Sequence, residues 1–241
     1  MKTYIIRLSD SELSCNLAKD AFRDAARFNY NPEYFEAIKG SDAESYLKLL
    51  HLEFSEDIPL QEQTPGTKGC FASHFTLWQA VANADKVSVI LEHDGLPVRD
   101  VAPIISLVDD VCHLDRHLPF NTFDDATHQV TYTRLIQDGS EEGVSEYPPT
   151  TFYDSKNKTG STFRGAYAYI ITPKGAQKLI NFCRTQGAMP SDKVLCENAV
   201  HIQRANVTYA RMHPFFKTLA YQHAFSTRFG DNQTKLQLDK S

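Results

Sequence analysis

Two carboxylates follow an apolar run near the middle of the sequence. Residues 87–91 read VSVIL, and Glu92, His93, Asp94 and Gly95 come directly after them. In an extended backbone, residues i and i+2 point to the same side, so Glu92 and Asp94 would repel each other there. A cation such as Mn²⁺ or Mg²⁺ relieves that repulsion and completes its shell with phosphate oxygens and water. The pattern indicates a cation–diphosphate site, and the alternative is a solvated acidic turn.

A second group of candidate residues shares one helical face within residues 66–78. The members of this face are Gly66, Gly69, Cys70, Ser73, His74, Leu77 and Trp78. Their spacing of three and four residues places them on one side of a helix. The small residues would let the helix approach a ligand or another backbone closely. The alternative is helix–sheet packing with His74 as a hydrogen-bonded core histidine.

Three isolated residues add to this set. Arg164 precedes a predicted strand, where its guanidinium could contact a phosphate or a sugar hydroxyl, and the alternative is a surface arginine beside a turn glycine. Asp192 lies near a helix start and is either a general base or a helix cap. His213 follows the last predicted strand and is either a third metal ligand or a surface histidine.

The elements that must position these residues alternate between strand and helix. Strands are expected at 3–8, 34–38, 87–91, 111–114, 166–171 and 207–210. Helices are expected at 11–28, 42–51, 67–83, 97–110, 173–184 and from 190 onward. Segments 52–65 and 115–163 read as loops, with a hairpin around 130–136. This alternation predicts an α/β fold with a central, mostly parallel sheet flanked by helices. Ligands bind beyond the carboxyl ends of such strands, where Glu92 and Asp94 would lie.

Composition narrows the function classes. The chain has 241 residues, of which 41% are hydrophobic and 23% charged, with a net charge of −5. No long basic block is present, which argues against a nucleic-acid partner. The five cysteines form no C-x-x-C pair, as expected in a reducing compartment. No apolar run reaches the roughly 18 residues of a membrane span. We therefore expect a cytoplasmic protein.

Taken in order, the motifs resemble those of glycosyltransferase family 25, which includes bacterial lipooligosaccharide and collagen galactosyltransferases. The motifs are G-x-x-G-C-x-x-S-H-x-x-x-W, L-E-x-D, G-A-Y-x-Y-x-I-T-x-x-G-A and P-x-D, and the resemblance covers roughly residues 3–215. It implies a single GT-A-like domain over 1–241, with a polar tail at about 230–241. It also implies a UDP-sugar donor, usually UDP-galactose, Mn²⁺ (or Mg²⁺) as cofactor, and inversion at the anomeric carbon. The partners would be the donor and a glycan or glycoconjugate acceptor.

The resemblance carries roles onto individual residues. The implied catalytic base is Asp192, and Glu92 and Asp94 match the metal motif, with His213 added as a candidate ligand. The implied donor-binding residues are Leu8, Ser9, Gly69, Cys70, Ser73, His74, Glu92, His93, Asp94, Arg164, Gly165 and Tyr167.

The sequence departs from the family pattern at three positions. His93 stands where the family usually has the middle Asp of L-E-D-D, and Ser14 stands where S-x-x-R has Arg. Arg7 stands in the first strand where Asn is common in the family. Two other functions therefore stay open. One is a non-catalytic or metal-independent nucleotide-sugar binder of the same fold, and the other is a metal-dependent phosphohydrolase. A lipid-linked acceptor would also bring the chain to the cytoplasmic face of a membrane, although no polybasic anchor is present.

Overall fold

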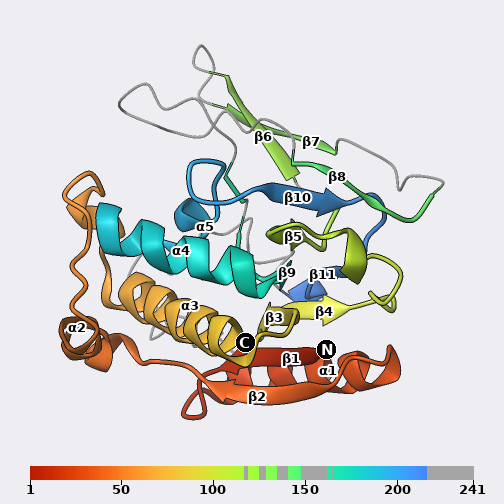
Figure 1. Cartoon of the computed structure of the whole chain (residues 1–241), viewed down its shortest axis with the longest axis horizontal. Helices are drawn as coiled ribbons and strands as arrows, with labels where there is room; N and C mark the ends of the chain where they lie inside the picture. The colour runs from red at the N-terminus through yellow and green to blue at the C-terminus, as the bar shows by residue number, and fades with distance from the viewer. Residues whose placement is uncertain (117–118, 125–128, 135–140, 148–161, 164, 216–241) are drawn as a thin grey trace, which may run out of the picture.

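The computed structural model describes residues 1–116, 119–124, 129–134, 141–147, 162–163 and 165–215. A seven-stranded sheet with the order β2-β1-β3-β9-β5-β10-β8 forms its centre (Figure 1). These strands are β1 Lys2–Arg7, β2 Pro32–Glu36, β3 Ser88–Glu92, β5 Val111–His113, β8 Val144–Glu146, β9 Ala168–Ile171 and β10 Ile202–Ala205. Strands β2, β1, β3, β5 and β10 run in one direction, and β9 and β8 run in the other. The predicted α/β fold with a mostly parallel sheet is confirmed, and it is consistent with a GT-A-like domain.

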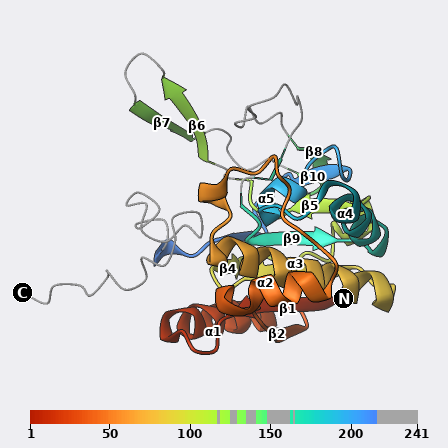
Figure 2. The same cartoon turned by 90° about the vertical axis from the view of Figure 1, so that its left-hand side faces the viewer.

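Helices cover both faces of this sheet. They are α1 Glu12–Arg27, α2 Gly40–Leu49, α3 Pro65–Ala84, α4 Pro173–Gln186 and α5 Ser191–Val194, with 3₁₀ turns η1 Leu60–Glu62 and η2 Ile105–Leu107. Helices α3 and α4 lie on one face and α1 lies on the other, as the two perpendicular views show (Figures 1 and 2). None of the helices in the described ranges is long and apolar enough to cross a membrane.

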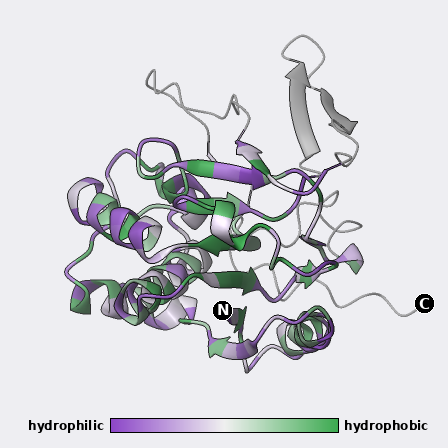
Figure 3. Cartoon of the chain, turned by 45° about the vertical axis from the view of Figure 1, so that its right-hand side comes forward, coloured by the Kyte–Doolittle hydropathy of each residue, from purple (hydrophilic) through white to green (hydrophobic). Residues whose placement is uncertain are grey.

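Alternate side chains of the central strands enter two separate cores. In β3, Ile90 packs in the core that contains α3 and α4, whereas Val89 and Leu91 pack in the core that contains α1. In β9, Tyr169 belongs to the first core and Ile170 to the second. This is the period of two that a strand buried on both faces requires. The hydropathy colouring accordingly shows green strands in the middle of the sheet (Figure 3).

Local signals explain where the helices that bear on the site begin. The Thr64 hydroxyl accepts a hydrogen bond from the amide of Thr67, and Pro65 occupies the first turn of α3. Helix α4 begins in the same way, with the Thr172 hydroxyl accepting from the amide of Gly175 at 3.0 Å. A side-chain oxygen cap followed by proline is a common helix start.

The prediction of a helix over 97–110 is wrong. Its first residue, Pro97, ends strand β4 Gly95–Pro97, and the rest contains only the 3₁₀ turn η2. The buried side chains of Val101, Ile104 and Val108 have helical spacing, which explains the error. The Asp100 carboxylate accepts a hydrogen bond from the amide of Ala102 instead, which favours a turn.

The prediction of a last strand over 207–210 is also wrong. The structure has β10 before this segment, at 202–205, and β11 Ala210–Met212 begins only at its last residue and runs antiparallel to β4. Val207 and Tyr209 are buried, which gives the segment a strand-like alternation. Its backbone crosses between two sheets rather than extending one of them, and the amide of Val98 donates to the Tyr209 carbonyl oxygen.

The predicted hairpin near 130–136 is confirmed, since β6 Pro119–Asp124 pairs antiparallel with β7 Gln129–Arg134. The predicted polar tail and Arg164 lie outside the described residues.

Candidate active site at the end of strand β3

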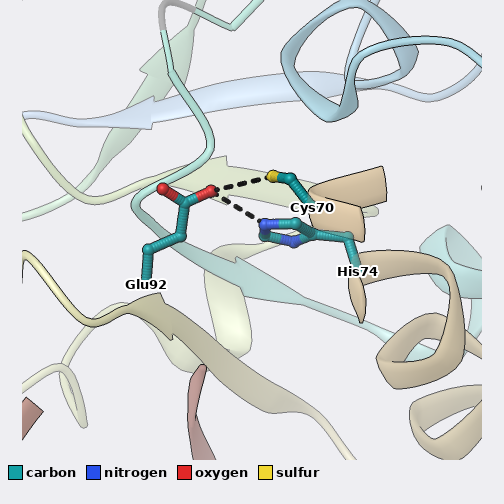
Figure 4. Close-up of side chains that lie close together, drawn as sticks. All are labelled: Cys70, His74 and Glu92. Atoms are coloured by element: carbon teal, nitrogen blue, oxygen red, sulfur yellow. Dashed lines mark hydrogen bonds and ion pairs between the residues drawn. The ribbon is translucent and has the colours of Figure 1, made fainter. Parts of the chain in front are cut away.

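Glu92, the last residue of β3, faces the first half of α3. Its Oε1 atom lies 3.0 Å from His74 Nε2 and 3.6 Å from Cys70 Sγ. Cys70 and His74 are four residues apart on α3, so both side chains reach the same carboxylate oxygen. Figure 4 shows the other oxygen of Glu92 pointing away from both residues. The Glu92 side chain keeps 26% exposure, so this second oxygen can meet a ligand.

Two buried aromatic residues, Tyr169 and Trp78, form hydrogen bonds on the side of His74 that faces away from Glu92. The Tyr169 hydroxyl lies 2.8 Å from His74 Nδ1 and accepts a hydrogen bond of 2.9 Å from Trp78 Nε1. All three side chains are fully buried. Sequence reasoning included His74 and Trp78 in one helical face but missed Tyr169. Tyr169 lies within β9 and packs in the core that contains α3 and α4, whereas Tyr167 precedes the strand and packs in the other core.

Asp94 lies two residues beyond Glu92, in a turn rather than in the extended backbone that the sequence suggested. Its side chain is buried, and its Oδ1 atom has no hydrogen-bond partner among the described residues. Burial and the nearby charge of Glu92 raise the pKa of Asp94 to about 8. Burial would also raise the pKa of Glu92, but the hydrogen bond from His74 outweighs it and lowers that pKa. A cation would favour ionised Asp94 and supply the partner that its oxygen lacks.

His93 and His213 flank Asp94. The amide of His213 donates to the Asp94 carbonyl oxygen at 2.7 Å, because β11 pairs with β4. The His213 ring is turned toward α1, with Nε2 3.5 Å from Asp20 Oδ2. Burial lowers the pKa of His93 and outweighs the opposite effect of the Glu92 charge, and His213 lowers this pKa further. The structure thus brings His213 beside Asp94 through the backbone, while its ring contacts another carboxylate.

Gly95 makes the tight turn after Asp94 fit against the neighbouring chain. The carbonyl oxygen of Tyr167 accepts a hydrogen bond of 2.9 Å from the amide of Glu92. A Cβ atom at Gly95 would overlap this same oxygen, so the backbone would have to move. The glycine therefore fixes the distance between the acidic turn and the segment before β9.

The Gly95→Ala substitution is expected to lower the free energy of unfolding by about 1–3 kcal/mol, the usual cost of overpacking. Chemical denaturation monitored by tryptophan fluorescence measures this difference. Gly66→Ala, in the first turn of α3, is the control and is expected to be neutral or stabilising. An unchanged denaturation midpoint for Gly95→Ala would show that the turn does not need the close approach.

Gly69 and Ser73 hold the segment between β2 and α2 against α3. A Cβ atom at Gly69 would collide with the backbone of Ile38. The Ser73 hydroxyl accepts from the amide of Ile38 and donates to the carbonyl oxygen of Gly69, both at 2.8 Å. These two predicted donor-binding residues thus make the close backbone packing that was the alternative interpretation of the helix face.

The end of β1 is held in a similar way. The amide of Leu8 donates to the Ser14 hydroxyl at 2.9 Å, and the amide of Ser9 donates to Glu36 Oε1 at 2.6 Å. Ser14, which stands where the family pattern described above has arginine, therefore accepts a hydrogen bond within the chain. Leu8 and Ser9 follow β1, the immediate neighbour of β3, at the same edge of the sheet.

The segment before β9 carries two further predicted residues. Gly165 has a φ of +87°, which favours glycine, and its carbonyl oxygen lies 3.2 Å from His113 Nε2. The Tyr167 hydroxyl donates to Asp115 Oδ2 at 2.8 Å. Sequence reasoning missed His113 and Asp115, although they follow the apolar residues of β5 much as Glu92 and Asp94 follow those of β3.

Helix α5, which contains Asp192, lies beside Cys70 of α3, although the two are far apart in the sequence. The Ser191 hydroxyl lies 3.7 Å from Cys70 Sγ, and Lys193 forms an ion pair of 2.7 Å with Glu62 of η1. Burial raises the pKa of the Cys70 thiol well above its usual value, and the charges of Glu92 and Asp192 raise it further. Asp192 is thus within electrostatic reach of the residues around Glu92.

Comparison with protein families shows to which family the chain belongs. The family model described as glycosyltransferase family 25 (LPS biosynthesis protein) matches residues 1–195. This chain belongs to glycosyltransferase family 25. A search of curated proteins gave no match.

As a family 25 glycosyltransferase, the chain has a sugar donor and an acceptor as its substrates. The matched region contains Cys70, His74, Glu92, Asp94 and Asp192. Strands β10 and β11 lie beyond it, so the contact between His213 and Asp94 comes from a part of the chain outside the match.

Proposed function

We propose that this glycosyltransferase transfers a hexose, with galactose as the first candidate, from a UDP-sugar to a hydroxyl group of a glycan or glycoconjugate. The transfer inverts the anomeric carbon and uses Mn²⁺ or Mg²⁺. The observation that carries the proposal is the placement of Glu92 and Asp94 at the carboxyl end of β3, in a chain of family 25. The proposed place of action is the cytoplasm or the cytoplasmic face of a membrane.

The residues at this position fit a divalent cation. The second oxygen of Glu92 points away from His74 and Cys70 (Figure 4), and Asp94 Oδ1 is buried without a partner among the described residues. Carboxylate oxygens are the ligands that Mn²⁺ and Mg²⁺ prefer. Glu92 and Asp94 would hold the ion, and His213 is a third candidate. When bound, the ion would neutralise charge on the departing diphosphate.

Asp192 is the proposed general base. An inverting transfer needs a group that accepts the proton of the acceptor hydroxyl, and this group must be separate from the metal ligands. Asp192 is partly exposed, belongs to a different element from Glu92 and Asp94, and lies next to Ser191, which contacts Cys70. The proposal assigns binding of the sugar to the segment with Arg164, Gly165 and Tyr167.

The remaining predicted residues would act less directly. Gly69 and Ser73 would position α3 through their backbone contacts. Leu8 and Ser9, at the end of β1, would meet the nucleotide part of the donor. The small Cys70 side chain would lie close to the diphosphate.

The test is an analysis of products. Purified protein is incubated with UDP-galactose, UDP-glucose or UDP-N-acetylglucosamine, with Mn²⁺, and with core oligosaccharide from lipopolysaccharide as acceptor. The proposal predicts UDP plus a glycoside whose anomeric configuration, read by NMR, is opposite to that of the donor. Release of inorganic phosphate would favour the phosphohydrolase alternative. Donor binding without any turnover across a panel of acceptors would favour the non-catalytic binder.

A further inference from the structure

A chain of hydrogen bonds runs from the core to Glu92. It joins Trp78 Nε1 to the Tyr169 hydroxyl at 2.9 Å, that hydroxyl to His74 Nδ1 at 2.8 Å, and His74 Nε2 to Glu92 Oε1 at 3.0 Å. The first three side chains are fully buried, so bulk water does not reach them and each polar atom needs a partner inside the protein. The direction of each hydrogen bond can therefore be worked out from donors and acceptors alone.

The direction of the first hydrogen bond is set by Trp78, whose indole N–H can only donate. The Tyr169 oxygen accepts that hydrogen bond, and its own hydrogen needs an acceptor. The acceptor in contact with it among the described residues is His74 Nδ1. A neutral imidazole that accepts at Nδ1 carries its hydrogen at Nε2, from which it donates to Glu92 Oε1.

The opposite tautomer satisfies fewer groups. With its hydrogen at Nδ1, His74 would donate to the Tyr169 oxygen and leave the buried Tyr169 hydrogen without its acceptor. The Nε2 lone pair would then face the carboxylate of Glu92. An unsatisfied buried donor costs about 1–3 kcal/mol, which is enough to fix one tautomer.

We infer that Tyr169 and Trp78 are positioning residues that fix His74 in the Nε2–H tautomer, so that His74 holds Oε1 of Glu92 and leaves Oε2 for the cation. This inference rests on the proposed function for its effect on the cation, although the tautomer itself does not. Groups that orient a ligand in this way typically contribute 10–100-fold to metal affinity or activity. Tyr169 and Trp78 would thus act without touching the substrate.

The same part of α3 and β3 also has the composition of a metal site. Cys70, His74 and Glu92 each offer one ligand atom, and these atoms lie within 4.8 Å of one another. The combination of sulfur, nitrogen and oxygen suits Zn²⁺. A zinc ligand must use the Nε2 lone pair, which moves the hydrogen to Nδ1 and deprives Tyr169 of its acceptor. The hydrogen-bond chain therefore favours the positioning role, and zinc binding becomes an outcome of the test.

The experiment compares Tyr169→Phe with Tyr30→Phe in the full-length chain. Tyr30 is also buried and its hydroxyl also donates a hydrogen bond, to the Arg99 carbonyl oxygen, but it lies in the core on the other face of the sheet. Nitrogen-15 NMR of the imidazoles gives the His74 tautomer, with His74→Gln used for assignment. Calorimetric titration with Mn²⁺ and UDP gives the affinity for the cation.

The expected result is an Nε2–H tautomer in the wild type and in Tyr30→Phe, and a mixed or reversed tautomer in Tyr169→Phe. Mn²⁺ affinity is expected to fall 10–100-fold in Tyr169→Phe and to change less than threefold in Tyr30→Phe. His74→Gln keeps an N–H near Glu92 and is expected to bind Mn²⁺ more tightly than His74→Leu.

Two results that do not depend on the Tyr169→Phe variant would overturn the inference. One is an Nδ1–H tautomer in the wild type, which needs no variant to fold. The other is tight zinc binding, measured with Zn²⁺ alone, that is lost in Cys70→Ser. If the tautomer depends on Tyr169 but no UDP-sugar is consumed, the positioning stands and the proposed function fails. If UDP-sugar is consumed and Tyr169→Phe changes neither tautomer nor Mn²⁺ affinity, the positioning fails alone.

Discussion

The substitution Asp192→Asn is expected to lower turnover by about 10²–10⁴-fold, the range that a positioned general base contributes. The amide has nearly the same shape as the carboxylate but cannot accept the proton of the acceptor hydroxyl. Because Asp192 is assigned to the base and not to the cation, UDP affinity in Mn²⁺ is expected to change less than threefold. Steady-state kinetics with UDP-galactose, together with calorimetric titration of UDP, measures both quantities.

Glu197→Gln is the matched control for this experiment. Glu197 follows α5 in the sequence, and its side chain is exposed. Its substitution also removes one negative charge, so it reports any general effect of charge on turnover. If Asp192→Asn retains turnover within a few-fold of the wild type, Asp192 is not the base. If UDP affinity collapses in Asp192→Asn, its role lies in donor binding.

The substitution Asp110→Ala is expected to lower the free energy of unfolding by about 2–3 kcal/mol, as hydrogen bonds to a charged group typically contribute. The Asp110 carboxylate is fully buried and accepts hydrogen bonds from Lys178 of α4 and from the amide of His201 at 2.9 Å. Its carbonyl oxygen accepts from the amide of Thr172, which caps α4. Removal of the carboxylate would therefore loosen α4 from β5 and β10, and denaturation in urea measures the loss.

The stability difference between wild type and Asp110→Ala should depend on pH in a defined direction. Burial would raise the pKa of Asp110, but the hydrogen bonds from Lys178 and the His201 amide outweigh burial and lower it below the usual 3.8. The stabilisation is therefore fully present above about pH 5 and is lost as the pH falls through the lowered value. Denaturation curves at pH 7, 5 and 3 are expected to show a constant difference at first and then a smaller one.

Asp109→Ala is the control for Asp110→Ala. The Asp109 side chain is 63% exposed and pairs with His201 at 3.0 Å, so its removal is expected to cost less than 1 kcal/mol. Equal losses for the two variants would contradict the structural role assigned to Asp110. A difference between wild type and Asp110→Ala that grows toward acid pH would contradict the direction of its pKa shift.

The sequence predicts elements well where local signals and burial agree. Strand β3 is an uninterrupted apolar run, and α4 begins at a threonine cap followed by Pro173. Prediction fails over 97–110 because buried apolar residues with helical spacing there belong to a loop. It also does not reveal that β9 lies antiparallel between β3 and β5, since strand order depends on contacts distant in sequence.

In the candidate site, too, features set by local sequence can be predicted, and contacts between distant residues cannot. The four-residue spacing of Cys70 and His74 predicts their common face, and the end of β3 predicts where Glu92 lies. The neighbourhood of Ser191 and Cys70 could not be predicted, because these residues are 121 positions apart. Tyr169 was missed because a tyrosine in a buried strand has the pattern of a core residue, and only its hydroxyl contacts show its place behind His74.

The most direct test of a cation–diphosphate site at Glu92 and Asp94 is calorimetric titration of UDP into wild type and Asp94→Asn, with and without Mn²⁺. With such a site, the wild type is expected to bind UDP more tightly in Mn²⁺, and Asp94→Asn is expected to lose this dependence. Circular dichroism would confirm that the variant is folded. UDP binding that is equal in both proteins and indifferent to Mn²⁺, or no UDP binding at all, would contradict a cation–diphosphate site at Glu92 and Asp94.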